Sequence, residues 1–428
     1  MTEFNNQSEQ RKERAIIVGV DLGITDDFAE SMEELEALAE ACNMEVVCIV
    51  TQKMPALHHS LYIGTGKVAE VREHVQNLWA DVVIFGDTLT PSQLRNLQQE
   101  LDTAVMDRTN LILEIFSKRA RTREARLQVE VANLQYILPR LVGMHEALSR
   151  QGGGSGFANK GSGEKKLELD RRKIEHRLAQ LRRELEEVSK DRQTQRKLRA
   201  NSGIPRVALV GYTNAGKSTM MNQMLKTYGG EEEKQVMEKD MLFATLETTV
   251  RNIRIDRNRQ LLLSDTVGFI NHLPHGLVKA FRSTLEEACE ADLILNVIDA
   301  SDIHHKQHIQ VTEETLKDLN VGDVPMIYVY NKADKCMEEK LPVVRGEDKI
   351  YLSARSGEGL SELIDMIFKK LHSGHLDAAF LVPYTDGRAV SDLMQNCTIY
   401  ETSYEDNGTL LKVSCELAIY QKYKEYLV

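Results

Sequence analysis

Apolar and polar positions alternate regularly along the first 116 residues, and the pattern predicts short buried strands separated by amphipathic helices. Strand-like runs cover residues 15–20, 45–51 and 82–85, and helical periodicity covers residues 31–41, 66–78 and 91–101. Such alternation is typical of a small α/β domain with a mostly parallel sheet. We therefore predict an N-terminal α/β domain over residues 1–116. Gly64-Thr65-Gly66-Lys67 favours a plain helix-start turn over the alternative of a second nucleotide site.

Apolar residues then recur at heptad spacing along two long segments. The first carries Leu127, Val131, Leu134, Leu138, Leu141 and Leu148, and the second carries Leu167, Ile174, Leu178, Leu181, Leu185 and Val188. Residues 151–163 between them are rich in glycine. Two apolar stripes joined by a flexible loop predict an antiparallel helical hairpin over residues 117–202, with the loop at its tip.

The remaining chain again mixes strand-like and helical runs. Residues 203–372 predict a second α/β domain, with a mixed, mostly parallel sheet and helices on both faces. Residues 373–428 predict a small α/β domain at the C-terminal end. Asn407-Gly408 marks a hairpin turn there, between strands at 397–404 and 410–416.

Composition and cysteine usage narrow the class of protein. A chain of 428 residues exceeds one ordinary core, and its 42% hydrophobic content is that of a soluble globular protein. Residues 1–14 lack the apolar stretch of a signal peptide, and no apolar run has the length of a membrane span. The six cysteines are scattered without a CxxC pair, which favours reduced thiols. We expect a cytoplasmic protein that acts as a monomer.

Positive charge is concentrated in the predicted hairpin. Residues 117–200 hold 21 Lys and Arg against 11 Asp and Glu, whereas the whole chain carries a net charge of −11. A solvated charged helix would carry balanced signs, so the excess indicates a localised contact with a polyanion. A flexible cationic loop at the end of a stalk suits insertion into folded RNA. The candidate RNA-binding residues beside this loop are Arg150, Lys160, Lys165 and Lys166.

A phosphate-binding loop follows a strand-like run at 205–210 and precedes a helical run at 219–225. Gly211-Tyr212-Thr213-Asn214-Ala215-Gly216-Lys217-Ser218 fits the eight-position Walker A pattern, and the strand–loop–helix setting argues against a chance match. Backbone N–H groups of such a loop wrap a polyphosphate, Lys217 reaches the β- and γ-phosphates, and Ser218 holds Mg²⁺. The expected phosphate contacts come from Gly211, Asn214, Ala215, Gly216, Lys217, Ser218 and Thr219.

The identity of the base is indicated by Asn331-Lys332-Ala333-Asp334, which ends a buried run at 324–330. The Asp334 carboxylate can accept two hydrogen bonds from guanine, and adenine offers no such pair of donors. Ser353-Ala354, after a strand at 349–352, is the usual supporting contact to the guanine oxygen. We therefore predict GTP as the bound nucleotide and a P-loop GTPase domain over residues 203–372.

The residues that respond to the γ-phosphate lie between these motifs. Asp265-Thr266-Val267-Gly268 predicts a carboxylate that holds Mg²⁺ through water and an N–H, that of Gly268, that senses the γ-phosphate. Thr245 is the favoured mobile-loop ligand of Mg²⁺, with Thr248 and Thr249 as alternatives. The predicted catalytic set is Lys217, Ser218, Thr245, Asp265 and Gly268, of which Ser218, Thr245 and Asp265 contact the metal.

Two positions bear on the rate of hydrolysis. Phe269 stands where signalling GTPases often carry a glutamine that orients the attacking water, and it has no polar side-chain atom. We expect slow intrinsic hydrolysis unless a partner or an ion completes the site. Asn214 is a candidate for holding a potassium ion against the phosphates, with a loop-stabilising role as the equal alternative.

The chain resembles the HflX family of translational GTPases from about residue 15 to about residue 425. Three passages carry the resemblance beyond the GTPase motifs: Asp107-Arg-Thr-Asn-Leu-Ile-Leu-Glu-Ile-Phe116, Leu127-Gln-Val-Glu130 with Leu138-Pro-Arg-Leu141, and Gly161-Ser-Gly-Glu164 leading to Leu167-Glu-Leu-Asp-Arg-Arg172. The resemblance implies binding to the large ribosomal subunit and splitting of stalled or idle ribosomes, often under stress. It also implies an apolar residue at Phe269.

Two departures and one alternative accompany the resemblance. The family's tip loop usually reads Gly-Thr-Arg-Gly-Pro-Gly-Glu-Thr, whereas residues 157–165 here read Phe-Ala-Asn-Lys-Gly-Ser-Gly-Glu-Lys. The family's Asp-Pro-Thr-Thr-Arg is replaced by Glu247-Thr-Thr-Val-Arg251. The first departure leaves open whether the tip serves heat-stress rescue or antibiotic resistance. The alternative function is an RNA-binding ribosome assembly factor that uses GTP as a latch, with hydrolysis incidental.

Overall fold

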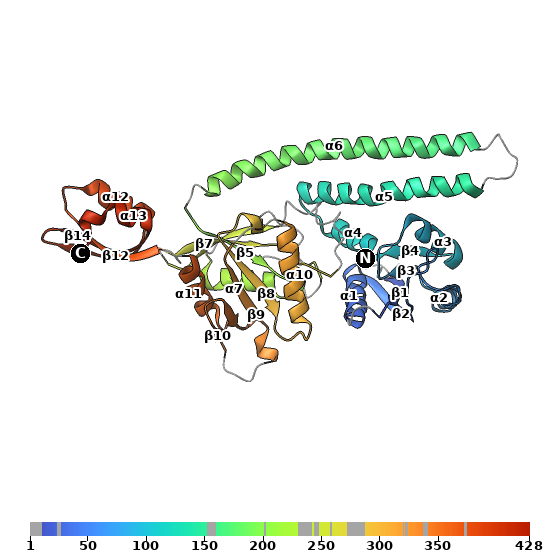
Figure 1. Cartoon of the computed structure of the whole chain (residues 1–428), viewed down its shortest axis with the longest axis horizontal. Coiled ribbons are helices and arrows are strands. Elements are labelled where there is room, and N and C mark those ends of the chain that lie inside the picture. The colour runs from blue at the N-terminus through green and yellow to red at the C-terminus, as the bar shows by residue number, and fades with distance from the viewer. Residues whose placement is uncertain are drawn as a thin grey trace, which may run out of the picture. The chain divides into compact units, whose positions relative to one another are not determined.

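The structure is a computed structural model, drawn in Figure 1. It describes residues 11–23, 27–151, 160–200, 203–229, 242–243, 248–256, 259–271, 287–319, 321, 324–336, 341–371 and 375–428. The chain forms two compact units. The first unit comprises Met1–Leu198, Lys239–Glu247 and Ile270–Thr284, and the second comprises Arg199–Glu238, Thr248–Phe269 and Leu285–Val428. The chain therefore crosses from one unit to the other just after residue 247 and just after residue 269.

The first unit contains a four-stranded parallel sheet in the order β2-β1-β3-β4. Val, Ile and Phe fill its strands on both faces, and helices cover the sheet, as expected for parallel strands. The strands are β1 (Glu13–Asp21), β2 (Met44–Lys53), β3 (Val82–Phe85) and β4 (Ala104–Asp107). The helices are α1 (Phe28–Ala41), α2 (Thr65–Leu78), α3 (Pro91–Leu101) and α4 (Arg108–Arg119).

Two long helices, α5 (Arg123–Gln151) and α6 (Lys160–Ala200), run side by side in the same unit (Figure 1). Leu127 and Val131 of α5 pack against Leu178 and Leu181 of α6, so the predicted helical hairpin is confirmed. The loop was predicted to extend to residue 163, but residues 160–163 belong to α6. Helix formation is cooperative, and the strong helix formers that follow extend the helix backward through these positions.

One buried carboxylate fastens the hairpin to the sheet, at a point in the second half of α5. Asp107 ends β4 with its side chain fully buried, and it accepts hydrogen bonds from the backbone N–H of Leu89 and of Asn110, at 3.0 and 2.8 Å. The Asn110 bond caps helix α4. Nη2 of Arg140, from α5, completes the set with an ion pair of 2.9 Å to the same carboxylate. Asp107 and Arg140 come from two of the passages that carry the family resemblance.

The second unit contains a seven-stranded sheet in the order β10-β11-β9-β8-β5-β7-β6, parallel except for β6 against β7 and β10 against β11. A cluster of buried Val, Leu, Ile and Met fills the space between this sheet and helices α7 and α11. The strands are β5 (Arg206–Val210), β6 (Thr249–Arg254), β7 (Gln260–Asp265), β8 (Leu293–Asp299), β9 (Met326–Asn331), β10 (Val343–Arg345) and β11 (Lys349–Tyr351). The helices are α7 (Lys217–Tyr228), α10 (His305–Asp318) and α11 (Leu360–Leu371).

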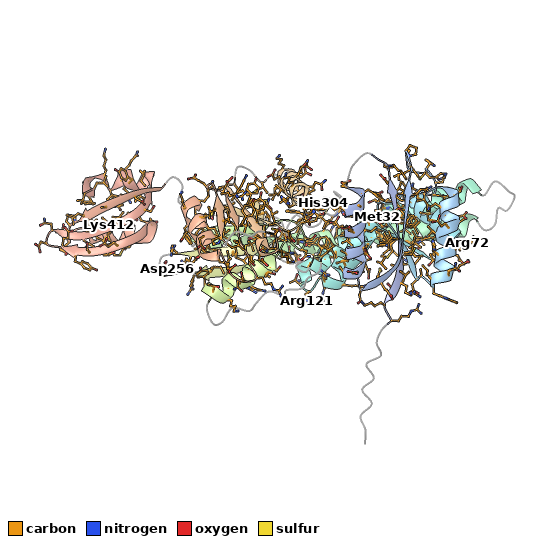
Figure 2. All side chains as sticks on the ribbon, turned by 90° about the horizontal axis from the view of Figure 1, so that it is seen from below. Met32, Arg72, Arg121, Asp256, His304 and Lys412 are labelled. Carbon is orange, nitrogen blue, oxygen red and sulfur yellow. The ribbon has the colours of Figure 1, made fainter. Side chains whose placement is uncertain are left out.

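The C-terminal residues form a three-stranded antiparallel sheet in the order β12-β14-β13, with two short helices packed on one face. The Asn407-Gly408 turn joins β13 to β14, as predicted from the sequence. Lys412 and Glu401 pair across these strands at 2.8 Å, and Figure 2 labels Lys412 on this sheet. The elements are β12 (His375–Val382), α12 (Gly387–Asn396), β13 (Thr398–Glu405), β14 (Gly408–Glu416) and α13 (Leu417–Lys422).

The predicted fold class is confirmed: a P-loop sheet preceded by a small α/β domain and a helical hairpin and followed by a small α/β region. The elements that the pattern of apolar residues did not predict include β4, α4, β6, β8, α10 and α11. All six cysteines are free thiols. Among the described residues, no helix is long and apolar enough to cross a membrane.

Replacing Arg140 by alanine tests the fastening of the hairpin. The substitution leaves the buried Asp107 carboxylate without its cation, so we expect the free energy of unfolding to fall by about 3 kcal/mol. Urea denaturation followed by circular dichroism measures the change. Arg172→Ala is the control, because Arg172 pairs with Glu168 on the surface of α6 and should contribute little. Equal stability of the two variants would contradict the proposed role of Asp107.

Candidate nucleotide-binding site

The phosphate-binding loop lies where β5 ends and α7 begins. Helix α7 starts at Lys217, and Gly216 caps it with a φ of +94°, a conformation that favours glycine. A Cβ at Gly216 would lie 2.2 Å from Nδ2 of Asn331. Glycine is therefore required both by the turn and by the close approach of the base-reading segment.

Lys217 is held inside the loop by two backbone carbonyls. Its Nζ donates hydrogen bonds to the oxygens of Gly211 and Tyr212, at 2.9 and 2.7 Å. Burial lowers the pKa of Lys217 to about 8, and the negative charge of Asp265 partly opposes this shift. The lysine is thus a buried cation whose charge a polyphosphate would stabilise.

The two described candidates for the metal site lie next to each other. Ser218 Oγ donates a hydrogen bond of 2.8 Å to Oδ2 of Asp265. Mg²⁺ prefers oxygen ligands and is commonly held by one or two protein oxygens together with substrate phosphates. A hydroxyl and a carboxylate beside the phosphate-binding loop fit that donor set, so Ser218 and Asp265 would hold the ion that neutralises the phosphates.

Gly268 and Phe269 lie directly against the phosphate-binding loop. A Cβ at Gly268 would lie 2.8 Å from Cα of Thr213 and 3.0 Å from Nζ of Lys217. The N–H of Phe269 donates to the Gly211 oxygen at 3.2 Å, and its oxygen accepts from the N–H of Thr213 at 2.8 Å. The Phe269 side chain is buried. Phe269 therefore contributes backbone hydrogen bonds and packing to the site. The sequence analysis considered only its lack of a polar side-chain atom and did not predict these contacts.

Asn331 connects the base-reading motif to the rest of the site. Its Nδ2 donates to the Ala215 oxygen, and its Oδ1 accepts from the N–H of Ala354, both at 2.9 Å. One amide side chain thereby joins the phosphate-binding loop to the Ser353-Ala354 segment. Asp334 lies exposed in the short helix Ala333–Lys335, where its carboxylate is open to a ligand.

Lys332 bridges the loop and strand β8. Its Nζ donates to the Asn214 oxygen at 2.8 Å and forms an ion pair of 2.8 Å with Asp299. Burial alone would raise the pKa of Asp299, but hydrogen bonds from Lys332 and Ser301 outweigh this effect and keep the pKa below its ordinary value. Sequence reasoning missed Asp299. The sequence feature that could have indicated this residue is a carboxylate directly after the apolar run 293–298.

Several predicted residues lie outside this cluster. Thr245 lies outside the described residues. Thr249 belongs to β6, where it pairs with Asp265, and this strand position disfavours it as a mobile-loop ligand. Asn214 is exposed with a φ of +59°, and the structure does not decide between its two predicted roles. Arg150, Lys160, Lys165 and Lys166 lie on the hairpin helices, and their side chains fall outside the described part.

Three family models match consecutive parts of the chain. "GTP-binding GTPase N-terminal" matches residues 29–117, "GTP-binding GTPase Middle Region" matches residues 119–199, and "50S ribosome-binding GTPase" matches residues 206–332. The GTPase HflX of Caldanaerobacter subterraneus subsp. tengcongensis is 42% identical over 97% of this chain and 94% of its own length. This chain belongs to the HflX family.

Other HflX proteins are similar over nearly the same extent. The GTPase HflX of Escherichia coli K12 is 37% identical over 93% of this chain and 92% of its own length. A solved GTP-binding protein from Sulfolobus solfataricus in complex with GDP is 24% identical, covers 84% of this chain and 98% of its own, and has a TM-score of 0.45. Membership of the HflX family makes the chain a GTPase, which agrees with the predicted enzyme class.

Asp334→Asn tests the base-reading role of Asn331 to Asp334. The amide loses the charged acceptor for two guanine donors, so we expect GTP binding to weaken by about 3 kcal/mol or more and xanthine nucleotide to compete better. Calorimetric titration measures both affinities. Asp318→Asn, at an exposed position of α10, is the control. Unchanged GTP affinity in Asp334→Asn would reject the assignment of Asp334 to the base.

The lowered pKa of Lys217 predicts a pH dependence of nucleotide binding. Phosphate favours the protonated lysine, and the free protein loses this proton as the pH rises through about 8. The affinity for GTP should therefore fall as the pH rises from 7.5 to 9, by at most about tenfold per pH unit. Titrations at several pH values measure this slope. In Lys217→Ala, only the nucleotide itself can titrate. If GTP affinity changed with pH equally in this variant and in the unsubstituted protein, the role assigned to Lys217 would be wrong.

Proposed function

We propose that this HflX-family chain binds the large ribosomal subunit and uses GTP to split stalled or idle ribosomes in the cytoplasm. The observation that carries the proposal is the hairpin. Helix α6 has 41 residues and is about 60 Å long at 1.5 Å per residue, and it is paired with the 29-residue α5. Beyond its ion pair with the sheet at Arg140, α5 continues for another 11 residues toward the loop, about 16 Å.

The charge and anchoring of the arm support RNA as its target. Residues 117–200 carry an excess of positive charge in a chain whose net charge is −11. Neutralising phosphates with these cations releases condensed counterions, which makes such binding strong and dependent on salt. The ion pair between Asp107 and Arg140 fastens the second half of α5 to the N-terminal sheet. The match to the model for 50S ribosome-binding GTPases supports the same partner.

The GTPase site supplies the switch in this proposal. The residues that would contact bound GTP and Mg²⁺ include Gly268 and Thr245, and hydrolysis would remove the γ-phosphate to which they respond. Lys217 neutralises phosphate charge, Ser218 and Asp265 hold the metal, and Asn331 with Asp334 selects guanine. Phe269 supports the alternative function of a GTP-latched assembly factor, because it offers no polar side-chain atom to an attacking water.

Deletion of the tip tests ribosome splitting. We expect a variant with residues 152–163 replaced by a short turn to keep its GTP affinity, because the nucleotide motifs lie beyond residue 203. The same variant should lose splitting, because the shortened arm no longer competes with the assembled ribosome. Sedimentation of intact ribosomes with the protein and a non-hydrolysable GTP analogue measures the conversion to subunits.

Two controls sharpen this experiment. Replacing Arg150, Lys160, Lys165 and Lys166 by alanine should cause a milder loss with a shallower dependence on salt. Lys217→Ala should bind nucleotide poorly and fail to split despite an intact arm. Normal splitting by the tip-deleted variant would show that the arm is an anchor only, and would overturn its assigned role.

A further inference from the structure

Two cysteines lie opposite each other in the C-terminal hairpin. In the antiparallel pairing of β13 with β14, Thr398 faces Ser414, so the next position along the ladder places Cys397 opposite Cys415. Cys397 continues the extended geometry of the strand, with a φ of −125° and a ψ of 152°. Opposite residues in such a ladder have Cα atoms about 4.5 to 5.5 Å apart, within the range of about 4.4 to 6.8 Å that a disulfide spans.

The two side chains lie on the same face of the sheet. Opposite residues of an antiparallel pair share a face, and both cysteines belong to the apolar cluster that the sheet forms with α12 and α13. Burial raises the pKa of the Cys415 thiol, and a hydrogen bond with the Cys397 thiol partly opposes this rise. The two sulfur atoms are therefore close neighbours, and a bond between them needs little movement of either strand.

The two thiols differ in their access to solvent. Cys415 is 1% exposed, and its Sγ donates a weak hydrogen bond of 3.6 Å to the Leu376 oxygen of β12. Cys397 is only partly buried where α12 ends, and its N–H donates to the Leu393 oxygen at 3.0 Å. An oxidant from solvent therefore reaches Cys397 first. An accessible thiol with a second cysteine beside it is the arrangement in which cysteine oxidation is reversible.

We propose that Cys397 and Cys415 form a site of reversible oxidation, at which a hydroperoxide converts the two thiols to a disulfide. The Cys397 thiolate attacks the peroxide, so that an S–O bond forms, the O–O bond breaks, and water or an alcohol leaves. The Cys415 sulfur then attacks the Cys397 sulfur and loses its proton to solvent. The displaced hydroxide takes up a proton and leaves as water. The thiols give up two electrons and two protons in total, and the hydroperoxide takes them.

The disulfide closes the hairpin at the end opposite its turn. Asn407-Gly408 joins β13 to β14 at one end, and the cysteines lie at the other. Strand β13 is an edge strand of the three-stranded sheet, and Cys397 also caps the end of α12. Oxidation therefore ties an edge strand and a helix end to the central strand β14. A dithiol reductant reverses the change by thiol–disulfide exchange.

Mass spectrometry of the full-length protein tests the proposal. The reduced protein is treated with hydrogen peroxide, quenched in acid, and then denatured and alkylated, so that every remaining thiol is labelled. We expect the protein to lose two hydrogen atoms, and the peptides that contain Cys397 and Cys415 to be recovered as a linked pair that dithiothreitol separates. Cys336, an exposed thiol outside the pair, is the internal control and should give no linked peptide.

Cys415→Ser is the matched variant, because it removes the second thiol and retains the first. Peroxide should then leave Cys397 as a sulfenic acid. We expect dimedone to label Cys397 about tenfold more, or higher, than in the unsubstituted protein, where the neighbouring thiol consumes the sulfenic acid. Cys415→Ala gives the same readout if serine destabilises the apolar cluster.

Two results would overturn the proposal. One is full alkylation of both Cys397 and Cys415 after a peroxide treatment that oxidises Cys336. The other is a Cys397 disulfide that forms only between two copies of the chain, seen as a dimer on non-reducing electrophoresis. Neither nucleotide nor ribosome is present in this experiment, so its outcome is independent of the proposed splitting activity.

Discussion

The nucleotide site depends on one buried positive charge. Lys217 is enclosed by the carbonyls of its own loop, and burial lowers its pKa to about 8. Such a cation is costly in an empty site and favourable beside a polyphosphate. The residues around Lys217 are of types that let the loop close around it. Gly216 and Gly268 allow close approach, and Asn331 and Lys332 tie the base-reading segment to the loop that holds the lysine.

The chain path links this site to the rest of the molecule. Within the first unit, Arg108 and Arg119 at the two ends of α4 donate hydrogen bonds to the backbone oxygens of Asn271 and Leu242. The same helix is capped by Asp107, whose partner Arg140 lies in the second half of α5. This one helix therefore bonds two distant backbone segments of its unit, and its N-terminal cap bonds the hairpin.

Sequence reasoning recovered features that are encoded locally and missed those that depend on distant partners. The Walker A loop, the Asp265 segment and Asn331 to Asp334 are each contiguous, so spacing alone located them. The hairpin followed from its apolar stripes. Helix α4 was missed because almost every residue from Arg108 to Phe116 is buried, which removes the amphipathic period. Strand β8 was missed because a short apolar run does not distinguish strand from helix.

The contacts of Arg108 and Asp299 were also beyond the sequence alone. Arg108 bonds Asn271 across a separation of 163 residues, and nothing near either residue signals the other.

The central claim is that the basic arm delivers a GTPase to the ribosome, and the rate of GTP hydrolysis with purified large subunits tests it most directly. The account predicts stimulation on the order of tenfold or more that declines as salt rises. A rate unchanged by large subunits at low salt would contradict it.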